Sequence, residues 1–122
     1  MISEIHVQAQ RHPSDLCIVV PLVAESAFTI FAVLDTGAPI SAIRPSLASR
    51  LEADGLLDPS GPPLRFRIRD LTADNQALPL IAFGLLRRLE RIDVDALLGL
   101  DFLSNFEEIR FNTKTLQLTL IR

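Results

Sequence analysis

The chain has 122 residues, of which 48% are hydrophobic, and its formal net charge is −3. This length predicts one domain over residues 1–122, and the apolar content argues against an intrinsically disordered protein. The negative charge and the lack of a Lys/Arg-rich segment argue against nucleic-acid binding, which needs a basic surface. We find no signal-peptide pattern and no run of about 18 apolar residues, so we expect a cytoplasmic protein that does not enter membranes.

The first third of the chain has the pattern of short strands. Segments 4–10, 16–24 and 28–34 are rich in Ile, Val and Phe and are separated by turn residues, and residues 40–44 form a further short candidate. Cys17 is the only cysteine, so it has no intrachain disulfide partner. The apolar run around it predicts a buried structural thiol rather than a nucleophile.

A helix is predicted next, over residues 45–55. This segment begins with a proline, which suits a first helical turn, and ends with a glycine, which favours a helix stop. The proline- and glycine-rich segment 58–63 predicts a break without regular structure. Strands resume at 64–69 and 77–86, with the loop 70–76 between them.

Alternation distinguishes the predicted strand at 64–69. Arg65, Arg67 and Arg69 alternate with Phe66 and Ile68. Side chains two residues apart lie on the same face of a strand. We therefore expect the three arginines to form the solvent-exposed face of a half-buried strand.

The last third of the chain predicts three more strands and a short helix. Residues 94–99 form a strand of buried character that ends at a glycine, and a short helix follows over 101–105. Segments 107–112 and 115–121 predict a terminal hairpin. The whole pattern predicts a mainly β fold with one or two short helices.

One motif suggests chemistry. The apolar strand 31–34 leads directly into Asp35-Thr36-Gly37-Ala38. A strand packed on both sides would hold the carboxylate of Asp35 rigidly, and Thr36 offers a hydroxyl that can lock the turn. Gly37 leaves room for a second carboxylate or a substrate to approach. Taken alone, the tripeptide also fits an ordinary turn, because Asp and Gly are common turn residues.

Three blocks in order resemble the retropepsin-like aspartic protease family. The first is the strand that enters Asp35-Thr36-Gly37-Ala38, and the second is segment 40–43 followed by the predicted helix. The third is segment 96–103, which contains the two-hydrophobics-then-glycine pattern at Leu97-Leu98-Gly99. Asp35 and Gly99 are 99 − 35 = 64 positions apart, a separation that suits the single-lobe form of this family.

The resemblance implies a closed acid-protease (retropepsin-like) β-barrel. It implies that Asp35 is catalytic, that Thr36, Gly37 and Ala38 form the active-site turn, and that Leu98 and Gly99 support it. In this family two aspartates share one proton and activate a water molecule. Because the chain has one such motif, the resemblance implies a homodimer, with terminal strands 2–10 and 115–121 covering each other across the interface. It implies a peptide or protein substrate and no cofactor, and two histidines and one cysteine suggest no metal site.

The flap of this family is harder to place. One candidate is segment 56–64, which is short and contains prolines that remove backbone donors. The other is segment 64–81, with residues 70–76 as its tip and without a glycine there. The sequence leaves both open. Pro39 directly follows the motif, where we expect it to stiffen the loop.

Other readings remain open from the sequence. A short flap suits a protease fold that serves as a catalytically weak or inactive binding or assembly module, because fold does not determine function. An unrelated small β protein that binds a ligand is a third possibility. Asp93, Asp95 and Asp101 are expected to be turn or cap residues. Asp101 as a second catalytic acid in the same chain is the disfavoured alternative.

Overall fold

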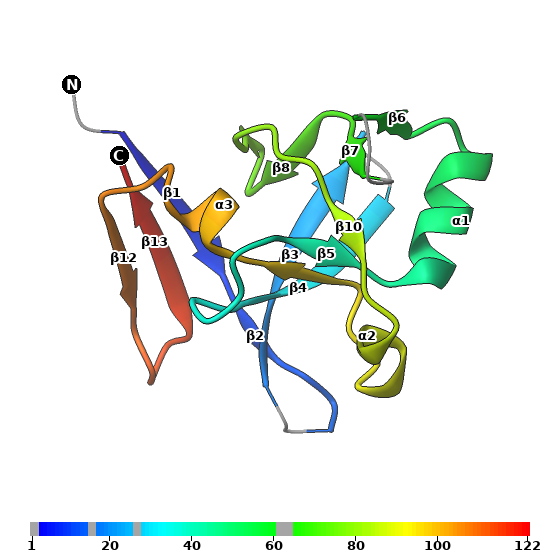
Figure 1. The fold of residues 1–122 in the computed structure, drawn as a ribbon. Coiled ribbons are helices and arrows are strands. Elements are labelled where there is room, and N and C mark those ends of the chain that lie inside the picture. Colours follow the sequence, from blue (N-terminus) through cyan, green and yellow to red (C-terminus); the bar gives the residue numbers. More distant parts are fainter. Residues whose placement is uncertain (1–2, 15–16, 26–27, 61–64) are drawn as a thin grey trace.

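Thirteen short strands and three helices form the described part of this computed structural model, which covers residues 3–14, 17–25, 28–60 and 65–122 (Figure 1). The helices are α1 (Pro45–Ala53), α2 (Arg88–Arg91) and α3 (Leu100–Leu103). The strands are β1 (Glu4–Gln8), β2 (Gln10–Arg11), β3 (Ile18–Ala24), β4 (Phe28–Leu34), β5 (Ala42–Ile43), β6 (Leu57–Pro59), β7 (Phe66–Ile68), β8 (Leu71–Ala73), β9 (Gln76–Ala77), β10 (Gly84–Leu85), β11 (Ala96–Leu98), β12 (Glu108–Phe111) and β13 (Gln117–Ile121).

The largest sheet has the strand order β10-β5-β11-β4-β3-β8-β9, with β2 paired to β3. Its centre contains a parallel pair, in which Val33 of β4 lies opposite Leu97 of β11. On its other side β4 pairs antiparallel with β3. All three residues of β11 are buried, as expected for a strand covered on both faces. The pairing with β3 ends at Ala32, so β11 is the neighbour that fixes the end of β4.

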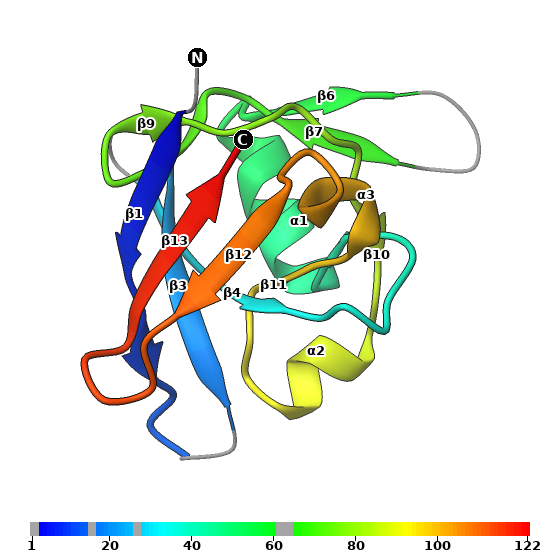
Figure 2. The ribbon, with the colours of Figure 1, turned by 90° about the vertical axis from the view of Figure 1, so that its left-hand side faces the viewer.

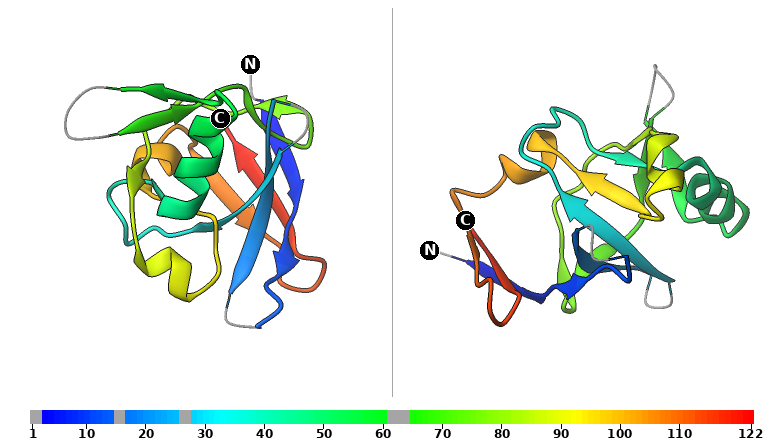
Figure 3. Two further views of the ribbon diagram at one scale, coloured as in Figure 1. Left: turned by 90° about the vertical axis from the view of Figure 1, so that its right-hand side faces the viewer. Right: turned by 90° about the horizontal axis from the view of Figure 1, so that it is seen from below.

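A second sheet joins the two ends of the chain. It has the order β1-β13-β12, and Val7 of β1 lies opposite Leu118 of β13. Buried and exposed residues alternate along β1, because one face of this sheet covers the core and the other meets solvent. In Figure 1 and in the right-hand view of Figure 3, this sheet and α1 lie on opposite sides of the molecule.

Helix α1 confirms the expected helix and its ends. Pro45 lies in its first turn, and Leu47, Ala48 and Leu51 form its buried face. Gly55 follows the helix with φ of +70°, a conformation that a glycine adopts without strain. The helix packs beside the two-stranded sheet of β6 and β7, which Figure 2 shows projecting at one end of the molecule.

Two expectations about the middle of the chain are wrong. Asp58 and Pro59, expected to begin an irregular break, lie in β6 and pair with β7; residues 61–63 of that break lie outside the described residues. The expected loop 70–76 contains β8 and the start of β9. Asp74 and Asn75 both have positive φ, which makes a tight two-residue hairpin turn between these strands. The expected strand 77–86 forms strand only at its two ends.

The expected closed barrel differs from the observed pairing. The described strands form three separate sheets, of eight, three and two strands, and none of these closes on itself. The mainly β character is confirmed. Three helices are present among the described residues instead of one or two, since Arg88–Arg91 forms the short helix α2.

Candidate active site

The carboxylate of Asp35 lies where β4 ends. The Asp35 N–H donates to Leu98 O at 2.9 Å, which extends the β4–β11 pairing by one residue. The Gly37 N–H donates to Asp35 Oδ1 at 2.8 Å, and the Ala38 N–H donates to Asp35 O at 3.2 Å. Asp35 is half-buried, whereas Thr36 and Gly37 are exposed. The carboxylate is thus oriented by the backbone and open to solvent on one side.

Gly37 allows this arrangement by its lack of a side chain. A Cβ at this position would lie 3.2 Å from Asp35 Oδ1. That distance is tighter than ordinary van der Waals contact, so a larger residue would push against the carboxylate it now hydrogen-bonds. The structure therefore gives the Asp-Thr-Gly spacing a steric reason.

Leu98 and Gly99 lie against the Asp35 turn, where the sequence placed them. The Leu100 N–H donates to Ala38 O at 2.8 Å, and the Asp101 N–H donates to Pro39 O at 3.2 Å. A Cβ on Gly99 would lie 2.5 Å from Ala38 O. Only glycine permits the two backbone segments to approach this closely.

A buried serine, which the sequence analysis missed, connects the two segments. Ser41 has no exposed surface. Its hydroxyl donates to Asp101 Oδ1 at 2.6 Å and accepts the Gly99 N–H at 2.9 Å. Its own N–H donates to the Asp101 carboxylate at 3.0 and 3.1 Å. A serine within an apolar run was the available signal, because a buried hydroxyl requires a partner.

Asp101 is committed to this network. Besides Ser41, its Oδ1 accepts the Phe102 N–H at 2.8 Å, and its Oδ2 lies 3.4 Å from Arg65 Nη2. These bonds direct the carboxylate toward the start of α3. Asp101 lies in the first turn of α3, whose N-cap is Gly99, so its role is to hold Ser41 and not to cap the helix, and these bonds disfavour a second catalytic acid.

The arginine face of β7 is partly as expected. Arg67 and Arg69 are exposed, and the intervening Ile68 is buried. Arg65 differs: it is half-buried, and its Nη2 donates to Ala82 O as well as to Asp101. Its Nε is buried without a hydrogen-bond partner among the described residues. Arg65 therefore belongs to the interior network and not to the solvent-exposed face.

The structure favours one of the two flap candidates. The proposed tip at 70–76 is tied into the large sheet, because Thr72 of β8 pairs with Val23 of β3. Leu71 and Ala73 are buried as well. This leaves the candidate at 56–64, of which residues 57–59 form β6; residues 61–64 are outside the described part of the chain.

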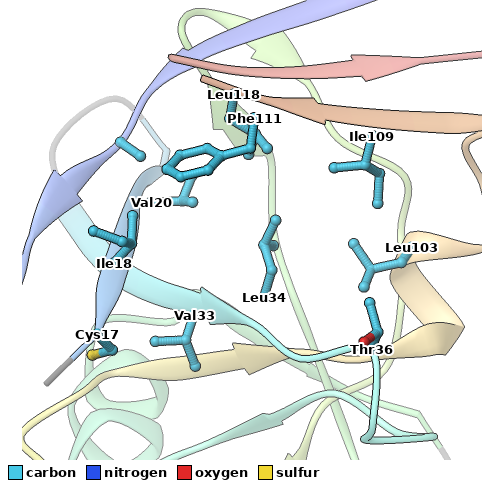
Figure 4. A pocket seen from close by; sticks show the side chains of 11 residues that line it. Cys17, Ile18, Val20, Val33, Leu34, Thr36, Leu103, Ile109, Phe111 and Leu118 are labelled. Carbon is cyan, nitrogen blue, oxygen red and sulfur yellow. The ribbon is translucent and has the colours of Figure 1, made fainter. Parts of the chain in front are cut away.

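An apolar groove of about 460 Å³ begins beside Thr36 (Figure 4). It lies between the end of β4 and the terminal sheet, and Val33, Leu34, Leu103, Ile109 and Phe111 contribute to its walls. The figure shows Ile109 and Phe111 pointing from β12 into it.

Cys17 also lines the groove, so the thiol expected to be buried is only partly so. The residue is half-buried at the start of β3. Burial raises the pKa of the Cys17 thiol. A raised pKa keeps the thiol neutral and unreactive at neutral pH, in agreement with a packing role.

Within the described ranges, no three His, Cys, Asp or Glu side chains gather in a way that could hold a metal ion. The same residues contain no helix that is long and apolar enough to cross a membrane.

Comparison with known proteins identifies the fold. Neither the family models nor the curated proteins contain a match to this sequence. Among solved structures, a retropepsin-like aspartic protease from Rickettsia conorii superposes with a TM-score of 0.61 at 20% identity, over 99% of this chain and 92% of the other. The retroviral protease-like domain of Ddi1 from Leishmania major superposes with a TM-score of 0.56 at 20% identity, over 82% of this chain and 88% of the other. The chain therefore has the retropepsin-like fold.

Proposed function

We propose that the chain is an aspartic endopeptidase that acts as a homodimer. The observation that carries the proposal is the half-buried carboxylate of Asp35, oriented at the end of β4 by Leu98 and Gly37. One chain supplies one such turn, whereas the chemistry needs two carboxylates that share a proton. A second copy, related by a two-fold axis, supplies the second turn.

In the dimer, the ionised Asp35 takes a proton from a water molecule, which attacks the carbonyl carbon of the substrate peptide bond. The partner's Asp35, which carries the shared proton, donates it to the carbonyl oxygen. The tetrahedral intermediate then collapses and the C–N bond breaks: the leaving nitrogen takes the proton that the first Asp35 had accepted from water, and a hydroxyl of the intermediate returns a proton to the partner's Asp35. The Gly37 N–H supports this chemistry by holding Oδ1 in place.

The substrate is expected to be an extended peptide with hydrophobic residues near the cleaved bond. Ile40 and Leu100 lie on the two segments that flank the Asp35 turn, and both are exposed apolar side chains. Apolar side chains of a bound peptide would cover them and gain the free energy of leaving water.

Strand β12 is the best candidate for the contact between the two copies. In the described part of the chain it pairs only with β13, so its other edge is unpaired. All four of its residues are exposed, among them Ile109 and Phe111. An unpaired edge with apolar side chains favours association with another strand.

The sequence of β12 suits pairing with its own copy. The Asn112 N–H donates to Gln117 O on the β13 side. Because directions alternate along a strand, the backbone groups of Ile109 then point to the free edge. A two-fold axis at Ile109 would let the two copies exchange both bonds. Glu108 would then lie opposite the partner's Arg110, a favourable cross-strand charge pair.

A binding or assembly module without catalysis is the second candidate. The short β6 and β7 strands favour it, with three residues each and a proline in β6. A short hairpin offers few backbone groups to a substrate strand. This module would dimerise and cleave no peptide.

The test is cleavage of a diverse peptide mixture, read by mass spectrometry from about pH 3 to about pH 8, by the parent protein and by Asp35→Asn. We expect cleavage by the parent alone, with both proteins folded by circular dichroism. Equal cleavage by the variant would refute the mechanism. Cleavage by neither protein, with both dimeric, would favour the binding module.

Mixing the parent with Asp35→Asn tests the shared site. If subunits exchange at random and each active dimer needs two Asp35 carboxylates, an equal mixture retains about a quarter of the activity. An active monomer would retain about a half. The total protein concentration is held constant, so that dissociation does not affect the comparison.

A further inference from the structure

A series of hydrogen bonds connects the Asp35 turn to the sheet of β6 and β7. Ser41 bonds to Gly99 and to Asp101 through its hydroxyl, and its carbonyl oxygen accepts the Gly84 N–H at 3.0 Å. Every polar group of this fully buried serine is therefore occupied. Loss of any one partner would leave a buried group unsatisfied, so the position of Ser41 depends on that of Asp101.

The Asp101 carboxylate is also contacted by a cation from a distant part of the chain. Its side chain is about one-quarter exposed, and Arg65 Nη2 is the cation beside it at 3.4 Å. The same nitrogen donates to Ala82 O. A single guanidinium thus contacts both Asp101 and the segment that leads into β10.

Arg65 belongs to a different structural unit from the turn. It directly precedes β7, and its own carbonyl oxygen accepts the Ser60 N–H at 3.0 Å, next to β6. The sheet of β6 and β7 lies at the same end of the molecule as α3 in Figure 2. Apart from an isolated bridge between Phe66 and Phe83, β6 and β7 form their own two-stranded sheet.

We propose that Arg65 is a positioning residue, which links the β6–β7 sheet to the Asp35 turn through Asp101 and Ser41. A shift of this sheet moves the guanidinium relative to Asp101, and Ser41 transmits the change to the Gly99 N–H and hence to the segment that holds Asp35. The inference rests on the proposed function only where it concerns the rate of cleavage. The structural link itself is independent of catalysis.

The first test uses amide NMR signals, with Arg65→Gln as the variant. Its control is Arg67→Gln, which removes the same charge from an exposed position two residues away. We expect the Gly99 and Gly37 signals to shift in Arg65→Gln and the Gly99 amide to exchange roughly five- to tenfold faster, because its acceptor is less well held. Both signals should stay unchanged in Arg67→Gln. Unchanged signals in Arg65→Gln would overturn the proposal.

The second test asks whether Arg65 acts through Asp101. Asp101→Asn keeps Oδ1 as an acceptor for Ser41 but removes the charge that attracts Arg65. If the two residues act in one chain, Arg65→Gln causes no further shift of the Gly99 signal in the Asp101→Asn background. Additive shifts would overturn the link. Should Asp101→Asn fail to fold, Arg65→Lys replaces it. Lysine keeps the charge, but one ammonium cannot reproduce both contacts, so the Gly99 signal of this variant should lie between those of the parent and Arg65→Gln. A shift as large as that of Arg65→Gln would contradict a role of the charge.

Kinetics separate this inference from the proposed function. We expect Arg65→Gln to lower kcat by about three- to tenfold with KM changed less than about twofold, since the turn and not the substrate contact is affected. Arg67→Gln should leave kcat unchanged. If the parent cleaves nothing, the proposed function fails while the NMR tests still decide the link. If the signals shift and kcat does not, the positioning role is overturned.

Discussion

At the scale of single residues, Gly99 has less room for a side chain than Gly37, the other glycine of the site. In Gly99→Ala the new Cβ would meet backbone atoms, at 2.5 Å from Ala38 O and 3.0 Å from Ile40 C. Backbone cannot rotate away as a side chain can, so we expect a loss of about 1–3 kcal/mol in the free energy of unfolding. Urea denaturation measures this loss.

Gly84→Ala is the matched control for that substitution. The nearest atom to its new Cβ is Ser41 O at 4.0 Å, so its free energy of unfolding should change by less than about 0.5 kcal/mol. Equal unfolding midpoints for Gly99→Ala and the parent would show that the segments separate without cost. That outcome would remove the steric reason for glycine after Leu98.

The same site shows which residues a sequence can identify. The positions of Asp35 at a strand end and of Gly99 beside it were predictable, because each requires a particular local backbone. Ser41 and Arg65 were not. Ser41 lies 60 positions from Asp101, and nothing in a short apolar run states which distant carboxylate completes its hydrogen bonds. Arg65 shares the alternation of Arg67, so only the fold distinguishes the two.

At the scale of elements, an exposed ion pair adds to the backbone pairing of β6 and β7. Arg69 binds Asp58 with both Nε and Nη2, the shortest contact being 2.7 Å. The hydrogen bond from Arg69 is the main cause that holds the pKa of Asp58 below its ordinary value of 3.8. The pair therefore supports the sheet above about pH 3.8, and this support is lost as the pH falls through the lower pKa of the folded state.

A titration of the Asp58 carboxyl carbon by NMR tests this effect. We expect its midpoint to rise in Arg69→Gln, because the bonded cation is gone. Arg67→Gln should raise it less, since Arg67 acts only through its charge. Identical midpoints in the parent and Arg69→Gln would show that the pair does not persist in solution.

Strands were predictable where burial alternates and uncertain where turns are short. Segments 4–10 and 115–121 were predicted as strands and form β1 and β13, where one face of the terminal sheet is buried. The β8–β9 hairpin was read as a loop, since its polar residues Asp74 and Asn75 form the turn itself and the flanking strands are only three and two residues long. Short strands are defined by their neighbours in the sheet, such as β3 for β8, and a single sequence does not reveal these neighbours.

At the scale of the whole molecule, the terminal sheet connects the fold to the proposed dimer. Strand β12 ends that sheet on one side, and the groove between it and β4 reaches Thr36. A second copy paired through β12 would therefore extend the sheet and cover the groove next to the active-site turn. The order of strands in the sheets was not predictable, whereas the expectation of a homodimer rested on the single Asp-Thr-Gly turn of the sequence.

Ile109→Lys tests this arrangement. In the proposed dimer the two-fold axis passes Ile109, so the variant would set two lysines directly opposite each other and remove an apolar side chain from the groove. We expect the dissociation constant of the dimer, measured by sedimentation, to rise roughly 100-fold or more. Cleavage should fall in parallel at low protein concentration and recover as the concentration increases, since Asp35 itself is intact.

Ile92→Lys is the control, because Ile92 is equally exposed but follows α2, on the opposite side of the molecule from β12 in Figure 1. A dimer of unchanged affinity in Ile109→Lys would place the interface elsewhere, whereas a loss of affinity in both variants would indicate a general effect of added charge.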